Sequence, residues 1–305
     1  MSDAGTAAVL RLEAPAPVLG VTLVAGGSRI SALLAGMRIA TWSCDEGRAL
    51  GEVTYRGPPP TAGATTRAGD CLAIATGDGA VRILDAGTLQ TKAEMPPARS
   101  PRGQLVFSPD GSLLAGLALG RHLELSVWNV GAARQICSFA DPALEPGNVA
   151  LHPDGRTAAM SLLTGDVLVL DLVSGRPTRT LSDAQMTADA LAFAANGSAL
   201  AAAAFDGTVL VWQLPSWSVR RARGIPGANA LAVTADGSQA VTSRNSYNPR
   251  DTPGEARLID LAADRVLARA SLGTVSHTDV ALLGAGHARV VSTRGSTLEL
   301  RDLRA

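Results

Sequence analysis

The chain has 305 residues, of which 46% are hydrophobic and 18% charged, and 27 basic residues balance 27 acidic ones. This composition is too apolar for a disordered chain, and zero net charge gives no basic field of the kind that attracts nucleic acid. No apolar run approaches the roughly 18–20 residues that a membrane helix needs, so we expect neither nucleic acid nor a membrane as partner.

The first twenty residues, MSDAGTAAVLRLEAPAPVLG, lack a positively charged segment, and the apolar run 7–10 is too short for a signal sequence. The three cysteines, Cys44, Cys71 and Cys137, are scattered without metal-ligand spacing. They are typical of reduced thiols in a protein core, so we expect a cytoplasmic protein. The basic residues are nearly all arginine, with Lys92 the single lysine, and alanine and glycine are abundant. This composition is typical of GC-rich coding and favours a bacterial source.

A repeat runs through the chain. Each repeat contains a β-branched or aromatic run that ends at a similar point, namely Ser43, Asp85, Asn129, Asp171, Gln213, Asp260 and Asp302. The steps between these points are 42, 44, 42, 42, 47 and 42 residues. A turn marker lies upstream in phase with them, as FSPDG (107–111), LHPDG (151–155), FAANG (193–197) and VTADG (233–237). Repeats of this length are typical of propeller blades.

Four short strand patterns separated by turn residues make up each repeat, and none has helical periodicity. In the fifth repeat they are 190–194, 198–204, 208–214 and 218–223. We therefore predict an all-β fold, a seven-bladed β-propeller of four-stranded antiparallel blades, as a single domain over residues 1–305. The predicted blades are approximately 18–56, 64–95, 103–139, 147–182, 188–223, 228–271 and 276–305 plus 6–12.

The stretch AAAAFDGTVLVWQL (201–214) illustrates the local signals. Asp206-Gly207 between two apolar runs predicts a two-residue hairpin in which both turn residues have positive φ. Middle strands should be buried on both faces and read as continuous apolar runs. The outermost strands, such as RPTRTL (176–181), SVRRAR (218–223) and RVLARA (265–270), place arginines at the rim.

The two ends of the chain are predicted to meet. The last repeat ends at Ala305 after its third strand, and residues 6–12, TAAVLRL, belong to no repeat. We expect this N-terminal strand to pair with residues 296–303 and to complete the last blade, which removes an open sheet edge. Burial of Val9, Leu10 and Leu12 would contribute about 1.5–3 kcal/mol each.

The Pro-Asp-Gly turn, the Asp-Gly hairpin and the Trp-Asp-like end of the third strand resemble the WD-repeat family over essentially the whole chain. The family's hairpin aspartate is present as Asp78, Asp166 and Asp206, and its tryptophan as Trp42, Trp128 and Trp212. Its histidine is missing from nearly every repeat, and only His277 lies near the expected point. The resemblance implies ring closure by the N-terminal strand and a protein-interaction scaffold. The missing histidines leave a related propeller family as the alternative.

No motif for catalysis, cofactor binding or metal binding stands out. The histidines His122, His152, His277 and His287 lie in no metal-ligand pattern. Ser276, His277 and Asp279 are triad residue types but are too crowded in sequence to align as a triad. We predict a non-catalytic protein without cofactor or metal. The alternative is a propeller enzyme, a lactonase- or lyase-type hydrolase, with acids and histidines of several blades gathered at an axial opening.

The largest departure from the repeat is the insertion SRNSYNPRDTPGEAR (243–257) in the sixth repeat. Loops on rigid scaffolds often carry function, and arginine and tyrosine are frequent interface anchors. We therefore predict a surface for a protein or peptide partner on a monomeric module. Its predicted residues are Arg223, Arg244, Tyr247, Arg250, Arg257 and Arg294, with Trp217 as a contact on the opposite face. A simply solvated loop is the alternative, and recognition of acidic peptides or phosphate groups by the arginines is a special case.

Overall fold

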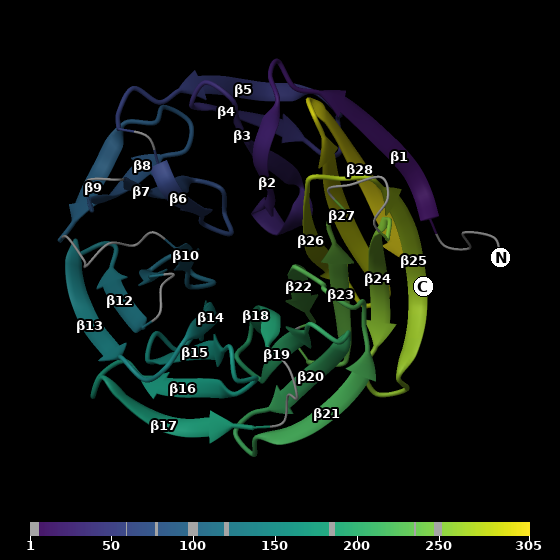
Figure 1. Ribbon diagram of the computed structural model, residues 1–305. Coiled ribbons are helices and arrows are strands. Elements are labelled where there is room, and N and C mark those ends of the chain that lie inside the picture. Colours follow the sequence, from purple (N-terminus) through teal and green to yellow (C-terminus); the bar gives the residue numbers. More distant parts are fainter. Residues whose placement is uncertain are drawn as a thin grey trace. The chain divides into compact units, whose positions relative to one another are not determined.

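The computed structural model describes residues 6–58, 60–76, 79–96, 103–118, 122–182, 187–234, 236–246 and 252–305. The described residues are all-β except for one short 3-10 helix, η1 (Ala25–Gly27). Their strands form seven four-stranded sheets, each called a blade below (Figure 1). The predicted fold class, with seven antiparallel four-stranded blades, is confirmed. None of these described segments contains a helix that is long and apolar enough to cross a membrane.

Two compact units divide the chain, and the first consists of residues 1–54 and 194–305. Blade one of this unit contains β2 (Val18–Val24), β3 (Arg29–Leu34), β4 (Arg38–Ser43) and β5 (Ala49–Thr54). The first unit also contains three strands of blade five, namely β19 (Ala199–Ala204), β20 (Thr208–Gln213) and β21 (Ser218–Arg223). Blade six contains β22 (Ala230–Val233), β23 (Gln239–Arg244), β24 (Gly254–Asp260) and β25 (Arg265–Gly273). The last blade contains β26 (His277–Gly284), β27 (His287–Arg294), β28 (Thr297–Arg304) and β1 (Thr6–Glu13).

The second unit, residues 55–193, holds three complete blades and β18 (Ala188–Phe193), the innermost strand of blade five. Blade two contains β6 (Pro60–Thr65), β7 (Cys71–Thr76), β8 (Val81–Asp85) and β9 (Thr91–Met95). Blade three contains β10 (Gln104–Phe107), β11 (Leu113–Leu117), β12 (Leu123–Asn129) and β13 (Arg134–Asp141). Blade four contains β14 (Pro146–Leu151), β15 (Thr157–Leu162), β16 (Val167–Asp171) and β17 (Arg176–Leu181).

Burial follows the position of a strand within its blade. All six residues of β19 are buried, five of them alanines, and the whole of β11 is buried as well. In contrast, five of the six residues of β17 are exposed, and so are four of the six in β21. This is expected where middle strands have packing partners on both faces and the outermost strand has a free edge. The tryptophans near the end of the third strands, Trp128 and Trp212, are fully buried and serve as core residues.

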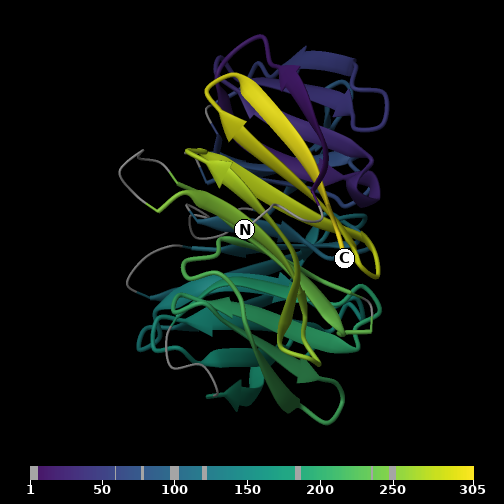
Figure 2. The ribbon, with the colours of Figure 1, turned by 90° about the vertical axis from the view of Figure 1, so that its right-hand side faces the viewer.

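The N-terminal strand completes the last blade, as predicted. β1 lies antiparallel to β28, with Leu10 opposite Leu300 and Leu12 opposite Leu298, and Figure 2 views this purple strand beside the yellow C-terminal strands. Leu12 is 7% exposed and joins a buried cluster with residues of blade one such as Ile30 and Trp42. The strand therefore closes its blade and also contributes to the core between the last blade and blade one.

The Asp206-Gly207 hairpin differs from the prediction. β19 ends at Ala204 and β20 begins at Thr208, so the loop has three residues. Gly207 has a positive φ of 92°, whereas Asp206 does not have a positive φ. The Gly207 N–H donates to the Ala204 carbonyl at 2.9 Å, which is the geometry of a turn followed by a left-handed glycine. The predicted two-residue turn is wrong, because Asp-Gly also suits this longer loop, where the Asp206 carboxylate accepts the Thr208 N–H at 2.8 Å.

Candidate functional site

Two of the arginines selected from the insertion, Arg244 and Arg257, contact the link between blades five and six. We define the five–six corner as residues 205–207, 224–227 and 252–254, all in the first unit. The link lies directly on the blade-five hairpin, because the Gly227 N–H donates to the Phe205 carbonyl at 2.9 Å and the Gly224 N–H to the Gly207 carbonyl at 2.7 Å. A Cβ on Gly207 would lie 2.8 Å from the Pro226 nitrogen, so the close approach requires glycine.

Two predicted arginines hold this corner through backbone carbonyls. The Arg244 guanidinium donates to the Pro226 carbonyl at 3.1 Å and to the Pro253 carbonyl at 2.8 Å. Arg257 donates to the Gly224 carbonyl at 2.8 Å and forms a two-point ion pair with Glu255, at 2.7 and 3.0 Å. Bidentate and charge-assisted contacts of this kind restrict side-chain motion. The arrangement makes the corner rigid, with each guanidinium committed to the position of the link.

The other predicted residues have different settings. Arg223 and Arg294 are exposed, at the ends of β21 and β27. Trp217 is partly buried, in the turn before β21, with a left-handed φ of 59° and its N–H donating to the Gln213 carbonyl at 2.6 Å. Tyr247 and Arg250 lie outside the described residues. The geometry therefore joins Arg244 and Arg257 at one corner.

Phe205 is a corner residue that the sequence pattern did not indicate as a binding residue. Its side chain is 56% exposed, in the hairpin on which the link rests. Pro226 and Pro253 are also exposed, so the corner presents apolar groups beside the arginine contacts. Exposed aromatic side chains are frequent anchors of protein interfaces. The sequence feature that could have indicated Phe205 is an aromatic residue directly before Asp-Gly, because this is a loop position where solvent exposure is normal.

The triad-like residues near the start of β26 contact different partners. His277 Nδ1 lies 3.4 Å from the Thr293 hydroxyl, within the last blade, and burial lowers the pKa of His277. Asp279 instead accepts hydrogen bonds from blade one, from the Leu23 N–H at 2.7 Å and the Thr22 hydroxyl at 3.0 Å. Desolvation by burial raises the pKa of Asp279, although these donors oppose the shift. The carboxyl group therefore joins two blades and does not orient the histidine.

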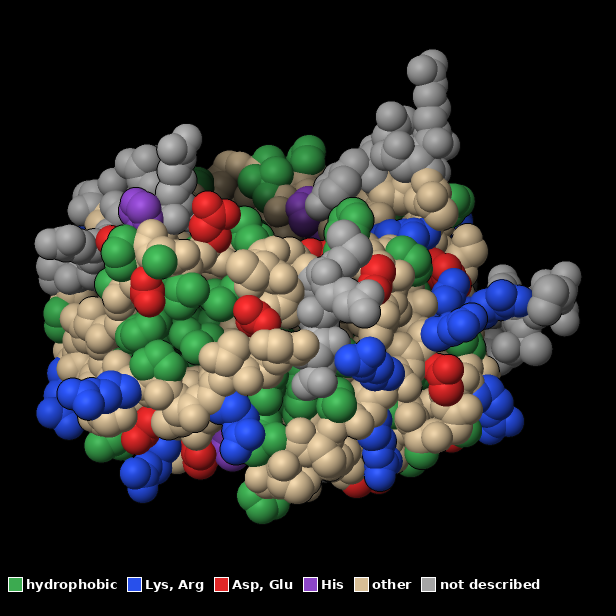
Figure 3. All heavy atoms as spheres, turned by 60° about the horizontal axis from the view of Figure 1, so that its bottom comes forward, with side chains coloured by type: hydrophobic (Ala, Val, Ile, Leu, Met, Phe, Trp, Pro, Cys, Tyr) green, Lys and Arg blue, Asp and Glu red, His purple; other side chains and the backbone are tan. Residues whose placement is uncertain are grey.

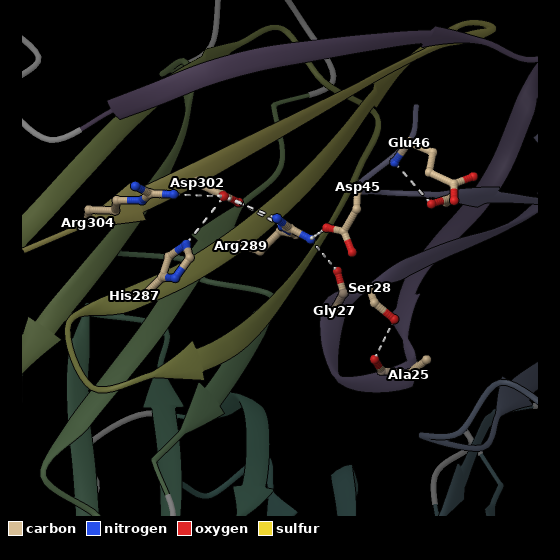
Figure 4. A network of polar contacts seen from close by, with 10 residues as sticks. Ala25, Gly27, Ser28, Asp45, Glu46, His287, Arg289, Asp302 and Arg304 are labelled. Atoms are coloured by element: carbon tan, nitrogen blue, oxygen red, sulfur yellow. Dashed lines mark hydrogen bonds and ion pairs between the residues drawn. The ribbon is translucent and has the colours of Figure 1, made fainter. Parts of the chain in front are cut away.

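A second polar cluster joins the last blade to blade one (Figure 4). Arg289 forms a bidentate ion pair with Asp302, at 2.7 and 3.2 Å, and donates to the Gly27 carbonyl at 2.9 Å. His287 Nε2 lies 3.3 Å from the same carboxylate. Burial alone would raise the pKa of Asp302, but Arg289 lowers it below its usual value. The ionised pair thus links the end of the chain to blade one.

This cluster has no nucleophile poised for chemistry. Burial raises the pKa of the Cys44 thiol to about 11, against the opposing effect of Arg289. A buried thiol of this kind stays protonated at neutral pH and is inert. Within the described ranges, no three His, Cys, Asp or Glu side chains come together in a way that could hold a metal ion. The arrangement supports blade-to-blade attachment.

The remaining histidines have structural settings. His152 packs edge-on against Phe193, with ring centroids 4.8 Å apart, and its Nδ1 accepts the Asp154 N–H at 3.0 Å in the turn before β15. His122 Nδ1 lies 2.8 Å from the Pro142 carbonyl. Each ring therefore has a local contact in its turn or loop.

Comparison with known proteins supports the resemblance stated above. No protein-family model matches the chain. A segment of 114 residues, 37% of this chain, is 30% identical to Protein LST8 homolog of Drosophila melanogaster. The match covers 36% of that protein, so the chain spans little more than a third of the relative it matches. This WD-repeat relative and the seven four-stranded blades together support a WD-repeat-like propeller.

Proposed function

We propose that the chain is a non-catalytic interaction scaffold whose protein or peptide partner docks on the five–six corner. The WD-repeat relative supports a protein-interaction role in general terms. The observation that carries the finer proposal is the exposed Phe205 ring on a hairpin fixed to the 224–227 link. A large apolar side chain left in water on a rigid support is a candidate binding anchor.

Rigidity of the corner favours this role. Arg244 and Arg257 hold three backbone carbonyls of the corner, so a partner would meet a preformed surface. Binding to a preformed surface avoids the entropy cost of ordering a loop. In this proposal the partly buried Arg244 and Arg257 position the surface, while the exposed Arg223, next to Gly224 of the link, supplies a polar contact near the Phe205 anchor.

The proposed setting is a monomeric, single-domain protein of the cytoplasm. Cys44, Cys71 and Cys137 are free thiols, which is the state that reducing compartments maintain. The compartment and the monomeric state are tested together by sedimentation of the full chain in reducing buffer and by fractionation of the source cells.

The docking proposal is tested by affinity capture with the full chain and two surface variants. Phe205→Asp is expected to remove the captured partner, because it places a charge at the centre of the apolar anchor. Val173→Asp is the matched control, since Val173 is 72% exposed in the turn before β17. Both variants should melt like the unmodified chain. Loss of the same partner from both variants, or from neither, would exclude docking at this corner.

A further inference from the structure

The outermost strands of blades five and six differ in charge from the other outer strands of the first unit. β21 (SVRRAR) contains three arginines and β25 (RVLARASLG) contains two, and neither strand contains a carboxylate. Arg220, Arg221, Arg223, Arg265 and Arg269 are all exposed. We call these five residues the outer arginine strip.

The two strands follow one another along the outer edge of the unit (Figure 1). Their junction is fixed by a hydrogen bond of 2.7 Å from the Arg223 N–H, at the end of β21, to the carboxylate of Asp264, directly before β25. Asp264 and Asp260 are the acidic residues of the adjacent turn, and Asp260 accepts the N–H groups of Ala262 and Ala263. The strip is thus an extended row of five cations beside two carboxylates that cap main-chain groups.

Protection of a free sheet edge does not account for this much charge. Charged residues on edge strands prevent edge-to-edge aggregation, and the outer strands β1 and β5 carry fewer arginines than β21. The other outer strands of the unit balance their charges. In β1, Arg11 pairs with Glu299 at 2.8 Å, and in β5, Glu52 pairs with Arg38 at 2.8 Å. Within the part of the chain that the structure describes, Arg220, Arg223 and Arg265 form no ion pair, whereas Arg221 and Arg269 each have an interaction partner.

We propose that the outer arginine strip binds an extended acidic segment of a second protein. β21 has a strand neighbour, β20, on one side only, so an extended chain can lie along its outer side, as peptides do on free sheet edges. Arginine recognises carboxylates through two parallel hydrogen bonds. β21 and β25 contain no aromatic residue, whereas binding of single-stranded nucleic acid generally relies on stacking against aromatic rings.

Figure 3 shows basic side chains in blue that stand out from the surface turned forward, with carboxylates in red scattered between them. This surface is separate from the five–six corner, and Arg223 alone belongs to both proposals. The strip therefore goes beyond the proposed docking at Phe205, and its test leaves Arg223 unchanged.

The test measures binding of a fluorescent oligoglutamate peptide to the full chain by anisotropy, at low and at physiological salt. Arg220→Glu combined with Arg265→Glu is expected to weaken binding by about tenfold, because two attractive contacts become repulsive. Arg29→Glu combined with Arg67→Glu is the matched control, with the same change in net charge at two exposed arginines outside the strip. The control should bind nearly as well as the unmodified chain, and binding should weaken with salt.

Three outcomes would overturn the assignment. These are unchanged binding in the strip variant, equal weakening in the control, or tighter binding of a single-stranded oligonucleotide than of oligoglutamate through the same two arginines. Thermal melting of both double variants verifies that they fold. Phe205→Asp should leave oligoglutamate binding intact, so failure of the strip and failure of the corner are distinguishable.

Discussion

Two blade-to-blade contacts of the first unit are built from different chemistry. Blades five and six pack through apolar side chains, among them Ala199, Val209 and Ile259, and the charged groups of Arg257 and Asp264 contact backbone groups across this boundary. The last blade and blade one also share an apolar cluster, but they add two charged groups of the last blade that contact blade one. Arg289, which pairs with Asp302 within its own blade, donates to the Gly27 carbonyl, and the Asp279 carboxyl group accepts from Leu23. Apolar packing is non-directional, whereas these charged contacts fix one relative position of the two blades.

The difference follows from chain connectivity. A six-residue link, residues 224–229, joins blade five to blade six, so their approach is limited by the covalent chain. The contacts between the last blade and blade one join residues more than 250 positions apart, such as Leu23 with Asp279 and Gly27 with Arg289. The short link between these two blades, residues 14–17, starts from β1, which is itself held in the last blade through its pairing with β28. We attribute the charged contacts to this indirect covalent connection, since polar groups in interfaces can specify register.

The largest expected effect comes from removing the N-terminal strand. A chain without residues 1–13 loses β1, exposes β28 and removes the buried Leu12 from the cluster. Burial of a leucine contributes about 1.5–3 kcal/mol, and the net stability of a domain is about 5–15 kcal/mol. We expect aggregation, or a melting temperature lower by about 10 °C. A chain that lacks only residues 1–5 keeps β1 and is the control. Equal melting curves for the two truncations would show that β1 does not hold the last blade.

The second effect tests the charged contact itself. Arg289→Met keeps an apolar stem but leaves the 15%-exposed Asp302 side chain without its bidentate partner. Removing one partner of a buried ion pair costs about 3 kcal/mol, which denaturant unfolding would measure. Arg11→Met is the comparison, because the Arg11 side chain is 71% exposed in its pair with Glu299. Exposed pairs contribute about 0–1 kcal/mol, so Arg11→Met should lose little stability. Similar losses of unfolding free energy in the two variants would contradict the importance of the Arg289 contact.

The third effect probes the apolar side of the comparison at the five–six corner. Gly207→Ala imposes a left-handed φ on alanine and places its Cβ 2.8 Å from the Pro226 nitrogen. Strained backbone of this kind costs about 1–3 kcal/mol. Gly155→Ala has a similar φ of 68° but no neighbouring atom within 4 Å, so it reports the strain without the clash. The free energy of unfolding that Gly207→Ala loses beyond the loss in Gly155→Ala measures how tightly the link is held. Equal losses in the two variants would mean that the corner rearranges at little cost.

The sequence predicted the repetitive part of this molecule well, because each blade carries its own turn residues. The in-phase Pro-Asp-Gly and Asp-Gly signals located the blades, and the unassigned residues 6–12 predicted the closing strand. The contacts of Asp279 and Arg289 were not predictable in this way, because their partners are far away in sequence and include backbone groups. For the same reason the sequence indicated arginines near the corner but not that Arg244 and Arg257 would bind carbonyls. The exposure of Phe205 depended on the geometry of its loop.

The smallest expected effect depends on pH and separates charge from hydrogen bonding at the last blade. Because the pKa of Asp279 is raised in the folded protein by desolvation, folding favours the protonated form. Its contribution is fully present below the unfolded-state pKa and is lost as pH rises through the folded pKa. Asp279→Asn keeps an oxygen to accept from Leu23 and Thr22 but carries no charge. Its stability relative to the unmodified chain should therefore increase from about pH 4 to about pH 8.

The control for this last variant is Thr22→Val, which removes one donor that favours the Asp279 carboxylate. It should raise the pKa of Asp279 further, so that the loss of stability with rising pH continues to a higher pH and becomes larger in total. The buried His277 has a lowered pKa and changes stability in the opposite direction, gaining as pH rises, but it is present in every variant and cancels in the differences. A pH-independent difference for Asp279→Asn would mean that the group acts through its hydrogen bonds alone, so that Arg289 and Asp302 provide the charge at this contact.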